Sequence, residues 1–166
     1  MAVTEKERLN LENALEQIAL AEKAAETLNY SFKRIPEIST DKDFSEAEWE
    51  RWDALTARFA RLADILTQRV FRAIDVIEFL PASSTFIDRI NRAEKRGHIQ
   101  SAYEWKEIRE IRNQIVHEYA TEYLLSLLED TVQHTPELLR CVDRLSGYKQ
   151  EITSKLESDR GIDIAR

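Results

Sequence analysis

Four polar side chains that could act on a phosphate group lie within the stretch RNQIVHEY, residues 112–119. They are Arg112, Asn113, His117 and Tyr119. A histidine can take or give a proton near neutral pH, and an arginine offers a permanently charged, planar set of donors that matches a phosphate. Asn113 could orient a substrate or His117 by hydrogen bonding. The stretch therefore indicates chemistry on a phosphoester.

Helical geometry divides these residues between two sides of one helix. At 100° per residue, Arg112 and Tyr119 lie within an apolar stripe, whereas Asn113 and His117 share another side. An unpaired buried charge costs several kcal/mol, so an arginine in this stripe needs a partner. Either the fold supplies a carboxylate or Arg112 lines a groove. The stripe consists of Trp105, Ile108, Ile111, Ile115 and Val116.

A purely structural interpretation of the same residues stays open. Polar side chains on a helix usually serve solubility or paired contacts. In that case Arg112 pairs with a carboxylate, His117 is an exposed polar residue, and Tyr119 buries its ring with the hydroxyl at the rim.

The stretch RNQIVHEY resembles the signature of the HEPN superfamily, and specifically that of HepT-like ribonuclease toxins, Arg-x4-His-x-Tyr with Asn after the Arg. The layout of a long second helix and a short third helix before the motif is also similar. The resemblance implies a HEPN-like bundle and a metal-independent endoribonuclease. Such an enzyme is the toxin of a type II or type VII-like toxin–antitoxin system, with a minimal nucleotidyltransferase as antitoxin.

The resemblance also implies roles for individual residues. The ribose 2′-hydroxyl attacks the adjacent phosphate, with His117 as acid or base, Arg112 as a clamp on the transition state and Asn113 as an orienting residue. A reaction with a separate base and acid uses two histidines, and a homodimer supplies one from each chain. Tyr119 is the residue that the nucleotidyltransferase would modify with AMP. No cofactor and no metal are expected.

Two other functions remain open for the same sequence. The first is a non-catalytic subunit that binds a nucleotide or substrate and partners a nucleotidyltransferase. The second is a structural interaction bundle that uses the long seam from Trp52 to Leu80. If the protein bound ATP but did not cleave RNA, the first function would be favoured. If it neither bound ATP nor cleaved RNA, the second would be favoured.

The composition predicts the fold that positions these residues. With 166 residues, three glycines, three prolines and 33% charged residues, we expect one all-α domain over 1–166, an up-and-down bundle of four to six helices. The net charge of −7 counts against a protein that coats nucleic acid, so an RNA site must be local and DNA is not an expected partner. No apolar run reaches ~20 residues, which predicts a cytoplasmic protein without a membrane partner.

Capping and turn residues predict where the helices begin and end. Thr4 and Ser45 each have a glutamate three residues later, Gly97 suits a helix end, and Pro136 predicts a kink or break. We expect the tail to fray from about 157. The predicted helices span 4–30, 45–80, 84–96, 101–119 and, from about 121, a C-terminal segment broken near Pro136.

Polar residues outside the motif have simpler interpretations. Arg69 interrupts the long apolar seam, most simply with its head turned out to water. Arg72 belongs to the same charged helix, and both could line an RNA approach if the chain is a ribonuclease. His98 and His134 suit loops or helix starts rather than metal sites.

Overall fold

The computed structural model describes residues 3–38, 43–81, 84–117 and 123–163, and these form an all-α bundle, as predicted. Within these ranges no strand is present. The elements are α1 (Glu5–Phe32), α2 (Glu46–Asp64), the π-helix η1 (Ile65–Val70), α3 (Phe71–Ile77), α4 (Phe86–Lys95), α5 (Ala102–Val116) and α6 (Leu124–Asp163).

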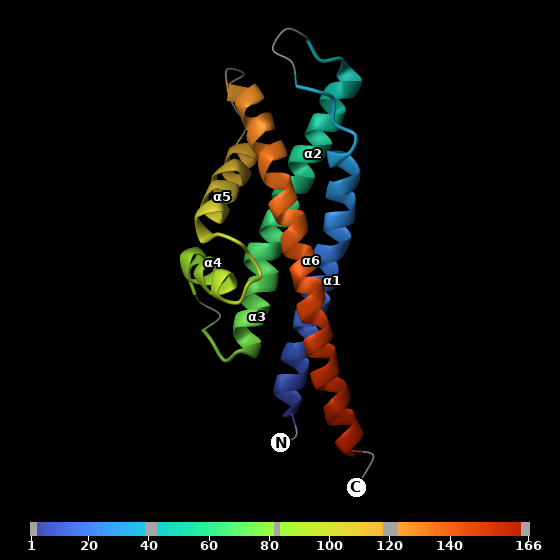
Figure 1. Ribbon diagram of the computed structural model, residues 1–166, viewed down its shortest axis with the longest axis vertical. Coiled ribbons are helices and arrows are strands. Elements are labelled where there is room, and N and C mark those ends of the chain that lie inside the picture. Colours follow the sequence, from blue (N-terminus) through green and yellow to red (C-terminus); the bar gives the residue numbers. More distant parts are fainter. Residues whose placement is uncertain (1–2, 39–42, 82–83, 118–122, 164–166) are drawn as a thin grey trace.

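The long helices alternate in direction, as Figure 1 shows. The run α2–η1–α3 returns antiparallel to α1, and α6 ends at the same end of the bundle as α1 begins. The first helix packs against α2 and α6, and α5 packs against α2 and α6. The short α4 contacts α3, η1 and α5, so it covers one side of the bundle rather than extending it.

Side-chain caps explain the predicted helix starts. Thr4 and Ser45 form reciprocal capping boxes with Glu7 and Glu48. A third box, in which Thr85 pairs with Asp88, begins α4. The end of α4 is fixed by Gly97, whose φ of 76° places it in the left-handed region that glycine adopts without strain.

The predicted helix over 45–80 differs from the structure in one respect. The chain stays helical from α2 to α3, but the π turn of η1 inserts an extra residue, because the N–H of Phe71 donates to the carbonyl of Leu66. The buried stripe therefore continues through Val70 and Ile74 instead of Arg69. As a result, Arg69 is exposed, which agrees with the simpler interpretation of that residue.

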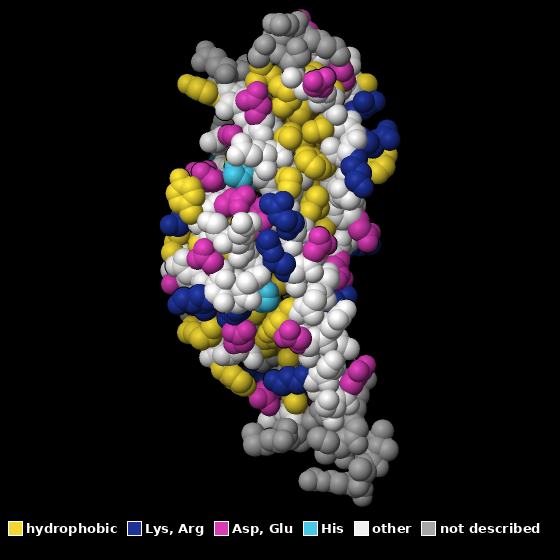
Figure 2. Space-filling model, viewed as in Figure 1, with side chains coloured by type: hydrophobic (Ala, Val, Ile, Leu, Met, Phe, Trp, Pro, Cys, Tyr) yellow, Lys and Arg dark blue, Asp and Glu magenta, His cyan; other side chains and the backbone are white. Residues whose placement is uncertain are grey.

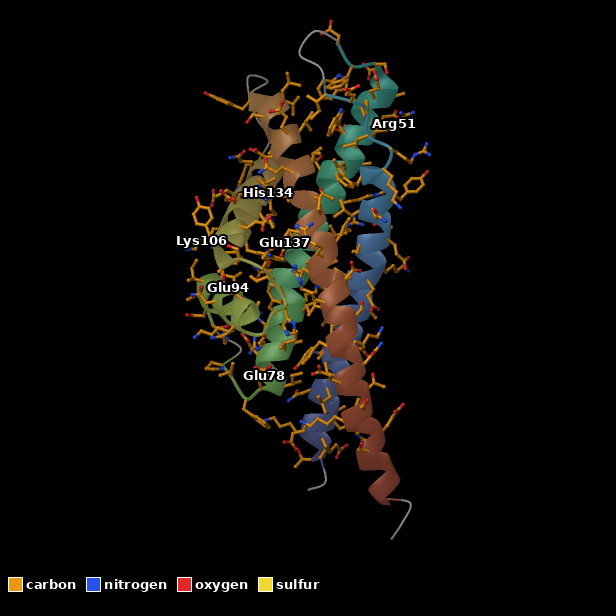
Figure 3. All side chains as sticks on the ribbon, viewed as in Figure 1. Arg51, Glu78, Glu94, Lys106, His134 and Glu137 are labelled. Atoms are coloured by element: carbon orange, nitrogen blue, oxygen red, sulfur yellow. The ribbon has the colours of Figure 1, made fainter. Side chains whose placement is uncertain are left out.

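Of the kink or break predicted at Pro136, the break is wrong, since α6 runs through this residue from Leu124 to Asp163. Packing on both sides of the proline outweighs the lost hydrogen bond. Glu137, labelled in Figure 3, is fully buried and accepts hydrogen bonds from Trp105 Nε1 at 3.3 Å and Arg144 Nη1 at 3.1 Å. The hydrogen bond from Trp105 joins α6 to α5 one residue after the proline, and the one from Arg144 lies within α6.

Buried apolar residues from all the long helices form one core, with Trp52, Trp105 and Phe59 among its largest members. Cys141 is a buried core residue, as expected. Among the described residues, no helix is both long and apolar enough to pass through a membrane.

Candidate functional site

Two of the motif residues, Arg112 and Asn113, lie on the wall of a groove with a volume of about 710 Å³. The groove runs beside η1 and α5, with Phe86 of α4 and Leu20 of α1 on its rim. Its lining is rich in positive charge, and Asp64 is the one carboxylate among the described lining residues. The arginines that line it are Arg61, Arg69, Arg109 and Arg112.

Arg112 is fixed by a two-point ion pair with Asp64, the last residue of α2. Nε lies 2.8 Å from Oδ1, and Nη2 lies 2.7 Å from Oδ2. The hydrogen bond to Asp64 raises the pKa of Arg112 against the opposing effect of burial. Both alternatives for Arg112 are thus realised together, because the fold supplies a carboxylate and the arginine also lines the groove.

Asn113 and His117 lie at the end of α5. The carbonyl of Asn113 accepts the backbone N–H of His117 at 3.1 Å, and its side-chain Oδ1 lies 3.3 Å from Arg112 Nη1. The helix ends at Val116 with His117 as its cap, so the prediction that it reaches about residue 119 is wrong. The imidazole of His117 is exposed and is not one of the groove-lining residues.

The remaining predicted site residues fall into three groups. Arg69 lines the groove, as it would on an RNA approach. Arg72 is exposed on the first turn of α3 and does not line the groove. Tyr119 lies outside the residues that the structure describes.

Val116 was expected within the buried stripe, but its side chain is 51% exposed. The helix ends at this residue, so no further turn of α5 covers it. Trp105, Ile108 and Ile111 of the same stripe are buried, as predicted. The stripe therefore packs along most of α5 and opens to water at the motif end.

Sequence reasoning did not identify Asp64 or Arg109 as site residues. A carboxylate partner for Arg112 was required, but the chain has 31 acidic residues and nothing local to Asp64 distinguishes it. Arg109 could have been found, because it precedes Arg112 by three residues and so shares its face of α5. Its guanidinium carbon lies 4.5 Å from the centre of the Phe86 ring, across from α5 to α4.

The other two histidines are buried. His134 lies inside α6, not in a loop as predicted, with Nδ1 3.4 Å from Oε1 of Glu104 (Figure 3). His98 follows Gly97 and packs against the Tyr148 ring at 4.8 Å between centroids. Burial, reinforced by nearby Arg96, lowers the pKa of His98 to about 4. Among the residues described, no three His, Cys, Asp or Glu side chains form a group that could hold a metal ion.

No protein-family model matches the sequence, and no curated protein matches it.

Proposed function

We propose that this chain is a metal-independent endoribonuclease of the HEPN type that acts as a homodimer. One observation carries the proposal: Arg112 is held by Asp64 at the wall of a groove lined by four arginines. Two hydrogen bonds fix the plane of the guanidinium before any substrate arrives, which is the preorganisation that stabilises developing negative charge. Asn113 lies beside it, and His117 is at the end of the same helix.

The proposed reaction needs a base, an acid and a cation. The 2′-oxygen of a ribose attacks the adjacent phosphorus and loses its proton to one histidine, while a second histidine protonates the departing 5′-oxygen. The products are a 2′,3′-cyclic phosphate and a 5′-hydroxyl. Arginine has five N–H donors, and within the described contacts Asp64 and Asn113 engage three of those on Arg112. The others remain for the phosphate oxygens.

The charge of the groove supports an RNA substrate. The chain carries a net charge of −7, which disfavours broad contact with a polyanion. Against that background, four arginines with one carboxylate in a single groove make a local positive site. Such a site would attract RNA to Arg112, while the net negative charge of the rest of the chain would repel RNA elsewhere.

A twofold dimer would bring a second His117 to the reaction. Each protomer has one such histidine, and α5 ends there with the exposed apolar side chain of Val116. Tyr123, which begins the next described segment, is also exposed. Burial of these two side chains between two copies would stabilise a dimer and place both motif ends together.

The proposal includes a partner. A minimal nucleotidyltransferase would act as antitoxin and attach AMP to Tyr119, and the added negative charge would interfere with RNA bound at Arg112. The chain would then be the toxin of the pair.

A second candidate is a subunit that binds a nucleotide without cutting RNA. The groove volume of about 710 Å³ lies within the usual range for small-molecule sites, and His117 does not line it. In this case Arg112 and Arg69 would hold phosphates and His117 would have no role in the groove.

Cleavage of a fluorescent RNA by the purified wild type, His117→Ala and Arg112→Ala separates these candidates. The ribonuclease proposal predicts that each substitution abolishes cleavage while circular dichroism and melting stay near wild type. Arg51→Ala, on the exposed surface of α2, is the matched control and should cleave normally (Figure 3). Full cleavage by His117→Ala would refute the mechanism. Binding of ATP with no cleavage by the wild type would favour the second candidate.

A further inference from the structure

Arg89 on α4 is a buried arginine without a carboxylate partner. Its side chain is 5% exposed, and among the described residues no acidic side chain lies within ion-pair distance. Nη1 donates to the carbonyl of Ser84, Nη2 donates weakly to Gln68 Oε1 at 3.4 Å, and Nε has no partner. An uncompensated buried charge is costly, so this arrangement calls for an explanation beyond packing.

Several positive charges lie around Arg89. Burial lowers the pKa of this guanidinium, and the nearby charges of Arg72, Arg92 and Arg109 lower it further against the opposing effect of Asp75. The two nearby carboxylates are already engaged. Asp75 is buried and accepts hydrogen bonds from Arg92 and Arg96.

The second carboxylate, Asp88, caps α4 by accepting hydrogen bonds from Thr85. Within the described part of the chain, Arg72 and Arg109 make no ion pair, and both are exposed. The result is a cluster of two exposed arginines and one buried arginine that make no ion pair with an acidic side chain of the described residues, and only the nearby charge of Asp75 offsets that of Arg89.

This cluster adjoins the groove. Gln68, which accepts from Arg89, lines the groove, as does Arg109, whose guanidinium covers the Phe86 ring. Arg109 and Arg112 are three residues apart on α5, about 4.5 Å along the helix axis. A chain of phosphates lying along α5 could therefore reach both.

We propose that Arg109, on the groove wall, and Arg72, just outside the groove, form a second phosphate-binding subsite next to the buried charge of Arg89. The exposed guanidinium groups contact the phosphate oxygens. Arg89 is a positioning residue that holds Gln68 and supplies positive charge. Arginine is suited to this task because its planar donors bind phosphate in pairs and it stays charged at every relevant pH.

The inference deepens the proposed function and rests on it for the ligand class. RNA presents a phosphate at every nucleotide, so a subsite beside Arg112 would hold a neighbouring phosphate and fix the strand relative to the reacting one. The same chemistry would also hold a terminal phosphate.

A non-cleavable probe tests the subsite apart from catalysis. A fluorescein-labelled 2′-O-methyl oligoribonucleotide lacks the attacking hydroxyl, and its binding to the full chain is measured by fluorescence anisotropy. We expect Arg72→Gln and Arg109→Gln each to weaken binding about tenfold, and to lower the slope of log affinity against log salt by about 0.7 for the lost contact. Arg51→Gln is the matched control and should change binding less than twofold.

Inorganic pyrophosphate and a 5′-phosphorylated form of the probe identify the source of the phosphate. Tighter binding of the 5′-phosphorylated probe, lost in Arg109→Gln, assigns the subsite to a terminal phosphate. Equal binding of both forms, with weak competition by pyrophosphate, assigns it to an internal phosphodiester. Either result supports the subsite where Arg109→Gln weakens binding, and unchanged binding by Arg109→Gln counts against it.

The subsite and the proposed function can fail separately. If Arg72→Gln and Arg109→Gln bind the probe as well as Arg51→Gln does, the subsite is refuted even where the wild type cleaves RNA. If the wild type never cleaves RNA but these two variants lose binding, the subsite stands and the ribonuclease proposal falls. Arg89→Lys, which keeps the charge with less risk to folding than a neutral residue, should retain more binding than Arg89→Met.

Discussion

Asp64 and Arg112 join the end of α2 to the C-terminal part of α5 through two hydrogen bonds of 2.8 and 2.7 Å. The side chain of Asp64 is 41% exposed and that of Arg112 is 29% exposed. Water screens an ion pair this open, so its contribution to stability is at most about 1 kcal/mol. Its main effect is therefore to fix the orientation of the guanidinium at the groove.

Asp64→Asn should lower the rate of RNA cleavage more than it lowers stability. Without the carboxylate, Arg112 loses its fixed plane, and we expect kcat to fall about tenfold. The groove also loses its negative charge, so KM for RNA should stay the same or decrease. Steady-state cleavage and urea unfolding measure the two effects. Asp53→Asn, an exposed position on α2, is the control; equal losses in both variants would contradict the orienting role.

Val116→Asp should convert the proposed homodimer into a monomer. Val116 is 51% exposed beside His117, and a charge there would make burial between two copies unfavourable. Sedimentation should give the mass of one chain, with loss of cleavage. Tyr103→Asp is the control, because Tyr103 is 70% exposed at the other end of α5 and should leave the dimer intact. A monomeric wild type would refute the dimer itself.

His98 should make the protein less stable in mild acid. Its pKa is about 4 in the fold, against the ordinary value of 6.5, because burial and Arg96 oppose its charge. The unfolded chain takes up this proton as pH falls through 6.5, while the folded chain stays neutral until about 4. Stability should therefore decrease over this interval, by about 3 kcal/mol in total.

Urea unfolding of the wild type and His98→Gln at several pH values tests this. The difference in unfolding free energy between the two proteins should be constant above pH 6.5 and should change only between 6.5 and about 4. A parallel decline in both proteins across that interval would show that His98 is not responsible.

Pro136→Ala should stabilise the protein by about 1–2 kcal/mol. The α-helix continues on both sides of Pro136, so alanine restores a backbone donor and a strong helix former without changing the buried neighbours. The midpoint of urea unfolding measures the gain. Gln133→Ala, on the exposed side of α6, should change stability by less than about 0.5 kcal/mol. A destabilised Pro136→Ala would mean that the packing requires the proline.

The helix limits set by local chemistry could be predicted from the sequence. Thr4 and Ser45 begin helices because their hydroxyls satisfy backbone donors within three residues, and Gly97 ends one because it adopts a positive φ. These effects involve neighbours in the chain, so the residue types are sufficient. The surroundings of Arg112 could also be predicted, because an arginine in an apolar stripe requires either a carboxylate partner or a groove.

Features that depend on packing between distant segments could not be predicted. Pro136 normally disrupts a helix, and only the contacts of Glu137 with α5 explain why α6 continues. Asp64 lies 48 residues from Arg112, and no short-range pattern connects them. The buried charge of Arg89 could not be predicted either, because its lack of an ion pair with any described acidic residue depends on how distant segments pack.

The extra residue in η1 rotates α3 about the helix axis relative to α2, although the chain stays helical between them. A single residue corresponds to about 100° of turn, so α3 presents a different side from the one that extrapolation of α2 would give. Gln68 and Arg69 lie within this wide turn and border the groove. Deleting one residue here would restore ordinary α-helical geometry. Either this groove wall or the face of α3 that contacts α4 would then be rotated away from its neighbours.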